Sequence, residues 1–120
     1  MQVLIVESNP DLGWLWKRHI DRMCEGATVV GDQHEAVAAL ERTAFGVIVL
    51  DLVLKDGSAI AVADYAAYRR PEAQVVFVTN STFFSDGSIF QHIANARAFL
   101  PAATPPEDLA AVVQHYGKAD

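Results

Sequence analysis

Short runs of apolar, largely β-branched residues alternate along the chain with longer segments whose apolar residues recur at helical spacing. The runs predict buried strands at residues 2–6, 27–30, 47–50, 74–78 and 97–100, because a strand covered on both faces is apolar at successive positions. The longer segments predict helices at residues 11–24, 33–43, 58–68, 88–94 and 107–116; each has an apolar stripe suited to packing on a core. This alternation predicts a parallel sheet with helices on both faces.

The segment at residues 45–57 contains the third strand, the acidic residue that ends it and a turn. Apolar residues 47–50 lead into Asp51, and Lys55, Asp56 and Gly57 then turn the chain, since glycine adopts backbone angles that other residues avoid. In open α/β sheets, ligands bind at the carboxyl ends of the strands, and Asp51 places a carboxylate there. The alternative interpretation is that Asp51 simply caps the following turn.

Other strand ends bring polar groups to the same edge of the sheet. The first strand ends in Glu7, the fourth is followed by Thr79, and the fifth is followed by the loop after Leu100. Two carboxylates and a hydroxyl are therefore expected to meet in one crevice. Such a set suits Mg²⁺, which needs few protein ligands and keeps several waters. A carboxylate beside a metal can also accept a phosphoryl group, because the cation offsets the developing charge.

Charge and apolar content narrow the class of protein. A net charge of −6 without a basic stripe argues against direct binding of nucleic acid, because nothing would displace phosphate counterions. There is no run of about 18 or more apolar residues to span a membrane, and no secretory signal is expected. The single cysteine, Cys24, cannot form an internal disulfide and is interpreted as an apolar filler in the first helix. These features favour a cytoplasmic location.

Four short motifs, in this order and at nearly this spacing, resemble the CheY-like receiver domain of bacterial response regulators. They are Leu-Ile-Val-Glu7-Ser-Asn-Pro, Val-Ile-Val-Leu-Asp51-Leu-Val-Leu-Lys-Asp-Gly57, Val-Phe-Val-Thr79-Asn and Ala-Arg-Ala-Phe99-Leu, and the resemblance covers essentially the whole chain. It implies a flavodoxin-like α/β three-layer sandwich, with a five-stranded parallel sheet in the order 2-1-3-4-5 and five helices. Residues 1–120 are accordingly expected to form a single receiver domain with no output domain.

The resemblance implies a role for each polar strand end. Asp51 falls where receivers accept phosphate from a histidine kinase or a phosphotransfer protein, and is the expected phosphoacceptor. Glu7 falls on the first of two acidic positions that bind Mg²⁺, and the backbone carbonyl of Val53 would be a further metal ligand. Thr79 falls on the hydroxyl that follows the phosphoryl group, and Phe99 stands where a switching aromatic residue reports the state to a downstream target protein.

Several positions depart from the family pattern. The second acidic position is Ser8, the position of an essential lysine is Ala102, and the usual proline after it is Ala103. The pocket then keeps two carboxylates and no ammonium, so the losses cancel in net charge but not in geometry. A lost charge-assisted hydrogen bond is worth roughly 1.5–3 kcal/mol, so the affinities for Mg²⁺ and phosphate are each expected to fall about tenfold or more. Lys55 is either a replacement cation or a solvated turn residue.

Aromatic residues suggest where a partner binds. Phe83, Phe84 and Phe90 lie in or near the expected fourth helix, beside Phe99. Two adjacent phenylalanines cannot easily both point into the core, so either one of them is exposed or both tuck under the loop. Trp14 falls off the apolar stripe of the first helix; it would either mediate homodimer formation or lie flat over its neighbours.

The expected function is that of a stand-alone response regulator receiver domain in a two-component phosphorelay, which accepts phosphate on Asp51 and signals by protein–protein interaction. The alternative is a pseudo-receiver that uses the same surfaces without phosphorylation. An enzyme is not expected: a small phosphatase with an aspartate nucleophile, of the haloacid dehalogenase type, needs a second acid two residues on, where this chain has Val53. Nucleotide binding is also disfavoured, because no glycine-rich phosphate loop follows the first strand.

Overall fold

The structure, a computed structural model, describes residues 1–79 and 95–117. The strands are β1 (Gln2–Val6), β2 (Gly26–Val30), β3 (Val47–Asp51), β4 (Gln74–Thr79) and β5 (Ala96–Pro101). The helices in the described residues are α1 (Pro10–Ile20), α2 (Gln33–Arg42), α3 (Ala59–Arg69) and α4 (Pro106–Gly117). The helix expected at residues 88–94 lies outside the described residues, so four of the five expected helices can be compared.

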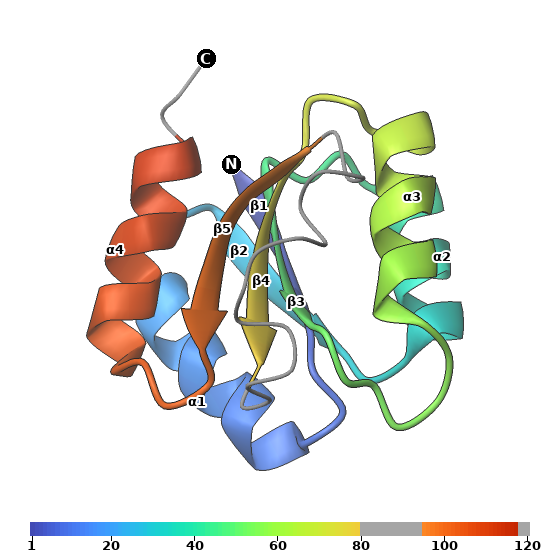
Figure 1. The fold of residues 1–120 in the computed structure, drawn as a ribbon. Helices are drawn as coiled ribbons and strands as arrows, with labels where there is room; N and C mark the ends of the chain where they lie inside the picture. The colour runs from blue at the N-terminus through green and yellow to red at the C-terminus, as the bar shows by residue number, and fades with distance from the viewer. Residues whose placement is uncertain (80–94, 118–120) are drawn as a thin grey trace.

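The strands form one parallel sheet in the order β2-β1-β3-β4-β5. Helices α1 and α4 cover one face of this sheet, and α2 and α3 cover the other (Figure 1). The structure thus confirms the predicted flavodoxin-like three-layer sandwich and its strand order. None of the helices in the described segments is long and apolar enough to cross a lipid bilayer.

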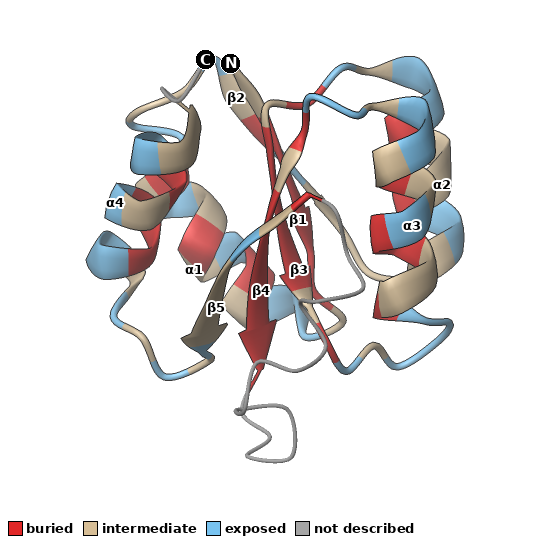
Figure 2. Ribbon diagram, turned by 45° about the horizontal axis from the view of Figure 1, so that its top comes forward, coloured by how far each residue is buried: buried red, intermediate tan, exposed pale blue. Residues whose placement is uncertain are grey.

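The core lies on both faces of the sheet, and the three middle strands, β1, β3 and β4, are buried at all but one end residue each (Figure 2). Alternate residues of each strand point to opposite faces. Leu4, Ile48 and Phe77 pack under α2 and α3, whereas Ile5 and Val49 pack under α1 and α4. This two-sided burial explains the continuous apolar runs, and it confines the polar residues of these strands to their ends.

Side-chain caps start the helices near their predicted positions. Asn9 Oδ1 accepts hydrogen bonds from the amides of Asp11 at 3.1 Å and Leu12 at 3.4 Å, and Pro10 occupies the first turn of α1. Asp32 caps α2 through the amide of Glu35 at 2.8 Å. Such caps satisfy amides that have no partner within the helix.

Helix α1 ends at Ile20, four residues before its predicted end. Asp21 causes this difference, because its Oδ1 accepts the amide of Ala27 at 2.9 Å and its Oδ2 pairs with Lys17 at 2.7 Å. These contacts turn the chain into β2. Cys24 therefore lies in the turn rather than in the helix, half-buried and with a free thiol.

Candidate functional site

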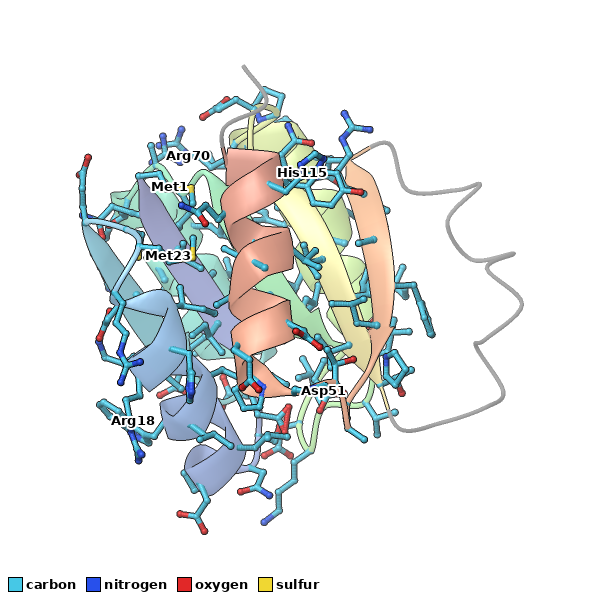
Figure 3. All side chains as sticks on the ribbon, turned by 90° about the vertical axis from the view of Figure 1, so that its left-hand side faces the viewer. Met1, Arg18, Met23, Asp51, Arg70 and His115 are labelled. Atoms are coloured by element: carbon cyan, nitrogen blue, oxygen red, sulfur yellow. The ribbon has the colours of Figure 1, made fainter. Side chains whose placement is uncertain are left out.

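The polar strand ends lie at the same edge of the sheet. Glu7 follows β1, Asp51 is the last residue of β3, and Thr79 is the last residue of β4. These three strands are neighbours, with Val6 paired to Leu50 in register. Asp51 lies at the end of the molecule opposite Met1 and Arg70 (Figure 3). The parallel topology thus brings together two carboxylates that are separated by most of the first two β–α units.

Glu7 and Asp51 form a closely coupled pair of carboxyl groups. Glu7 is only 4% exposed. Burial, together with a hydrogen bond to and charge repulsion from Asp51, raises the pKa of Glu7 from 4.5 to about 8, although the amide of Asn9, 3.3 Å from Oε1, acts in the opposite direction. At neutral pH the Glu7 carboxyl is therefore protonated. The carboxyl pair therefore does not carry, at neutral pH, both of the negative charges that were expected from the sequence.

The Glu7 carboxyl also has an unsatisfied atom. Its Oε2 is buried, and no donor from the described residues faces it. A buried oxygen of this kind is costly unless a proton or a cation satisfies it. The carboxyl pair can therefore hold either a shared proton or a metal ion, and the two compete for the same oxygens.

Asp51 is oriented by the loop that follows it. Its Oδ1 accepts the amide of Val53 at 2.9 Å, so Asp51 does cap the turn. The side chain is also half-buried rather than enclosed, and it faces Glu7. From the sequence, capping the turn and a role in ligand binding were alternatives for Asp51, but the two are compatible. The Val53 amide fixes the carboxylate, and the side chain stays partly exposed.

Ser8 makes contacts that sequence reasoning missed. Its hydroxyl donates to the carbonyl of Gly31 at 2.8 Å and accepts the amide of Lys55 at 2.8 Å. At the position where the resemblance places a second acidic ligand, this chain thus has a hydroxyl that joins two neighbouring loops. The only signal in the sequence was a small hydroxyl residue directly after a strand-ending acid.

Ala102, at the position of the family's essential lysine, and Lys55, the candidate replacement, differ in the side chain that they present. The amide of Ala102 donates to the carbonyl of Thr79 at 2.9 Å, so residue 102 is held beside the end of β4 but presents only a methyl group. Lys55 is exposed and makes no ion pair with any carboxylate of the described residues. Thr79 itself is buried, 3% exposed.

The donors present suit a divalent cation only in part. No group of three or more His, Cys, Asp or Glu side chains in the described parts of the chain could hold a metal. The carboxylates of Glu7 and Asp51 and the carbonyl of Val53 are oxygen donors of the type that Mg²⁺ uses with several waters. The buried, unsatisfied Oε2 of Glu7 fits such an ion, which would first have to displace the Glu7 proton.

The expected partner surface can be followed only at its edges. Phe99 is half-buried in β5, beside Phe77 of β4, and packs on the core under α2 and α3. Phe83, Phe84 and Phe90 lie outside the described residues. Trp14 is 57% exposed, with the ammonium of Lys17 5.8 Å from its ring centroid. Its position off the apolar stripe is confirmed, and its role in self-association stays a prediction.

Comparison with solved structures places this geometry in a known fold. A CheY-like response regulator receiver domain protein from Methanospirillum hungatei JF-1 has a TM-score of 0.87 and 20% identity, covering 98% of this chain and 94% of its own. The signal receiver domain of a putative Luxo repressor protein from Vibrio parahaemolyticus has a TM-score of 0.84 and 25% identity, covering 98% and 90%.

The receiver domain of NtrX from Brucella abortus is similar in the same way, with a TM-score of 0.86 and 18% identity over 98% of this chain and 99% of its own. No protein-family model matches the sequence, and no curated protein sequence matches it. The likeness therefore lies in the three-dimensional arrangement, which extends over nearly all of the chain.

Proposed function

Since the chain has the fold of a CheY-like response regulator receiver domain, we propose that it acts in two-component signalling by accepting a phosphoryl group on Asp51. The observation that carries this proposal is the pairing of the Glu7 and Asp51 carboxyls at the carboxyl edge of β1 and β3. A nucleophilic carboxylate, only half-buried, is held there beside a second acid.

In the proposed reaction, a carboxylate oxygen of Asp51 attacks the phosphorus of a phosphohistidine. The new O–P bond forms as the P–N bond breaks, and the imidazole of the donor leaves and takes up a proton. The amide of Val53 holds Oδ1 of Asp51 and so fixes the carboxylate for attack. Bound Mg²⁺, held by the two carboxylates and the Val53 carbonyl, would supply positive charge at the transferring group. The donor would be a histidine kinase or a phosphotransfer protein.

Readout by protein–protein interaction completes the proposal. Thr79, buried at the end of β4, would have its hydroxyl drawn toward the phosphoryl oxygens. Phe99, on the neighbouring strand, would pass this change to the surface that a downstream protein binds. The chain would thus act as a switch and not as an enzyme; in place of the second acid of an aspartate phosphatase stands Val53, whose apolar side chain is 55% exposed.

A second candidate function is a docking module that needs no phosphorylation. The proton on Glu7, the methyl group at Ala102 and the hydroxyl contacts of Ser8 all favour it. Each of these features removes a charged partner of the phosphoryl group or of its metal, without disturbing the fold that presents the surfaces.

Phosphorylation in solution tests both candidates. The purified chain is incubated with acetyl phosphate and Mg²⁺, and its intact mass is measured; we expect a gain of one phosphoryl group in the wild type and none in Asp51→Asn. Asp56→Asn is the matched control, because it removes an exposed carboxylate from the same loop and should leave the adduct intact. No adduct in the wild type at high donor concentration would favour the docking module, and turnover of small phosphate esters would indicate a phosphatase.

A further inference from the structure

We propose that Ser8 is a positioning residue: its hydroxyl holds the loop after β3, which carries the Val53 carbonyl, and so preforms the acceptor pocket around Asp51. The part of the proposal that concerns ligand binding, of a phosphoryl group with Mg²⁺, rests on the proposed function. The placement of the loop can be tested on the ligand-free protein alone.

The Ser8 hydroxyl joins the carboxyl ends of three adjacent strands. Ser8 follows β1, and its Oγ accepts the amide of Lys55, which follows β3, at 2.8 Å. The same Oγ donates to the carbonyl of Gly31, which follows β2, at 2.8 Å. Because the hydroxyl uses its single proton in one bond and a lone pair in the other, it links the β2 and β3 loops through the end of β1.

The far end of the same loop is held by the start of α2. The side-chain Oε1 of Gln33 accepts the backbone amide of Ser58 at 2.8 Å, and the backbone amide of Gln33 donates to the carbonyl of Asp56 at 3.3 Å. Gly57 has a φ of 92°, and a Cβ atom there would collide with the side chain of Gln33. The loop therefore packs directly on Gln33 at one end and is tied to Ser8 at the other.

Serine satisfies both of these contacts, and a carboxylate cannot. An aspartate side chain at position 8 could accept the Lys55 amide, but it would place a second acceptor against the Gly31 carbonyl. Alanine would make neither bond, whereas threonine keeps a hydroxyl that can make both. Where the family has an acidic residue that adds a negative charge, Ser8 thus holds the loop after β3 in place. A loop ordered before the ligand arrives lowers the conformational cost of binding.

Variants at position 8 test the proposal by two readouts. The first is the exchange rate of the Lys55 amide in the ligand-free protein, and the second is the affinity for beryllofluoride with Mg²⁺. For Ser8→Ala we expect exchange to be faster and binding to be weaker, each by about fivefold or more, the equivalent of one hydrogen bond. Ser8→Thr should restore both. Ser58→Ala is the matched control, because it removes a helix cap, 3.2 Å from the Ala61 amide, without touching the Ser8 contacts.

The outcomes separate this proposal from the proposed function. Wild-type exchange at Lys55 in Ser8→Ala would overturn the role of Ser8 in holding the loop. Faster exchange with unchanged beryllofluoride affinity would overturn its role in preforming the pocket, as would equal losses in Ser8→Ala and Ser8→Thr. If the wild type takes up no beryllofluoride, the proposed function fails, and the exchange rates of the two variants then decide the Ser8 proposal by themselves.

Discussion

Replacing Glu7 by glutamine should stabilise the folded protein at neutral and alkaline pH. The pKa of Glu7 is raised from 4.5 to about 8 by burial and by Asp51, so between these values the folded state keeps a proton that the unfolded chain has lost. The free energy of unfolding therefore falls as the pH rises through this interval and levels off above it. At about 1.4 kcal/mol per pH unit, the loss reaches on the order of 3 kcal/mol at pH 7 and 4–5 kcal/mol at pH 8. Glutamine has no such proton to lose.

Urea unfolding at a series of pH values between 4.5 and 9 measures this effect, with tryptophan fluorescence as the reporter; of the two tryptophans, Trp16 is 1% exposed and should change most on unfolding. We expect the stabilities of the wild type and Glu7→Gln to diverge with rising pH and to differ by a constant amount above pH 8. Glu72→Gln, which changes an exposed glutamate, should follow the wild type throughout. Parallel curves for the wild type and Glu7→Gln would refute the protonated state of Glu7.

The same experiment with Mg²⁺ tests the competition between metal and proton. A cation at the carboxyl pair needs Glu7 ionised, so Mg²⁺ should stabilise the wild type more strongly as the pH rises toward 8. Glu7→Gln should gain much less from Mg²⁺ at the same pH. Equal stabilisation of the two proteins would place Mg²⁺ elsewhere than at Glu7.

Three further substitutions test other parts of the structure. Gly57→Ala should destabilise the protein by about 1–3 kcal/mol, because its φ of 92° is unfavourable for alanine and the new Cβ would collide with Gln33; an unchanged urea midpoint would contradict this. Ala102→Lys should tighten beryllofluoride binding, measured calorimetrically, by about tenfold, because it returns an ammonium to the pocket; unchanged affinity would show that residue 102 does not face the ligand. Arg70→Ala should cost about 1–2 kcal/mol in thermal unfolding, since its guanidinium donates to carbonyls at the end of α2 at 2.9 and 3.2 Å; wild-type stability would show that these bonds contribute nothing.

Much of the fold is determined by patterns of residues that are close together in the sequence. The run Val47–Asp51 is apolar at each position until its last, which predicts both a strand buried on two faces and an acid at its carboxyl end. Asn9 and Pro10 predict the start of α1 in the same local way. Alternation of such segments restricts the chain to a parallel sheet covered by helices, and the resemblance to receiver domains implied which strands are neighbours. The acidic edge of the sheet was therefore predictable without coordinates.

Only the tertiary structure decided the chemical state of that edge. The pKa of Glu7 depends on how deeply its carboxyl is buried and on Asp51, which is far away in sequence. The two bonds of Ser8 reach across 23 and 47 residues, and α1 ends early because Asp21 bonds to the amide of Ala27 in the next strand. Periodicity and caps operate within a few residues of one another, whereas desolvation and long-range hydrogen bonds depend on which groups the folded chain places opposite each side chain.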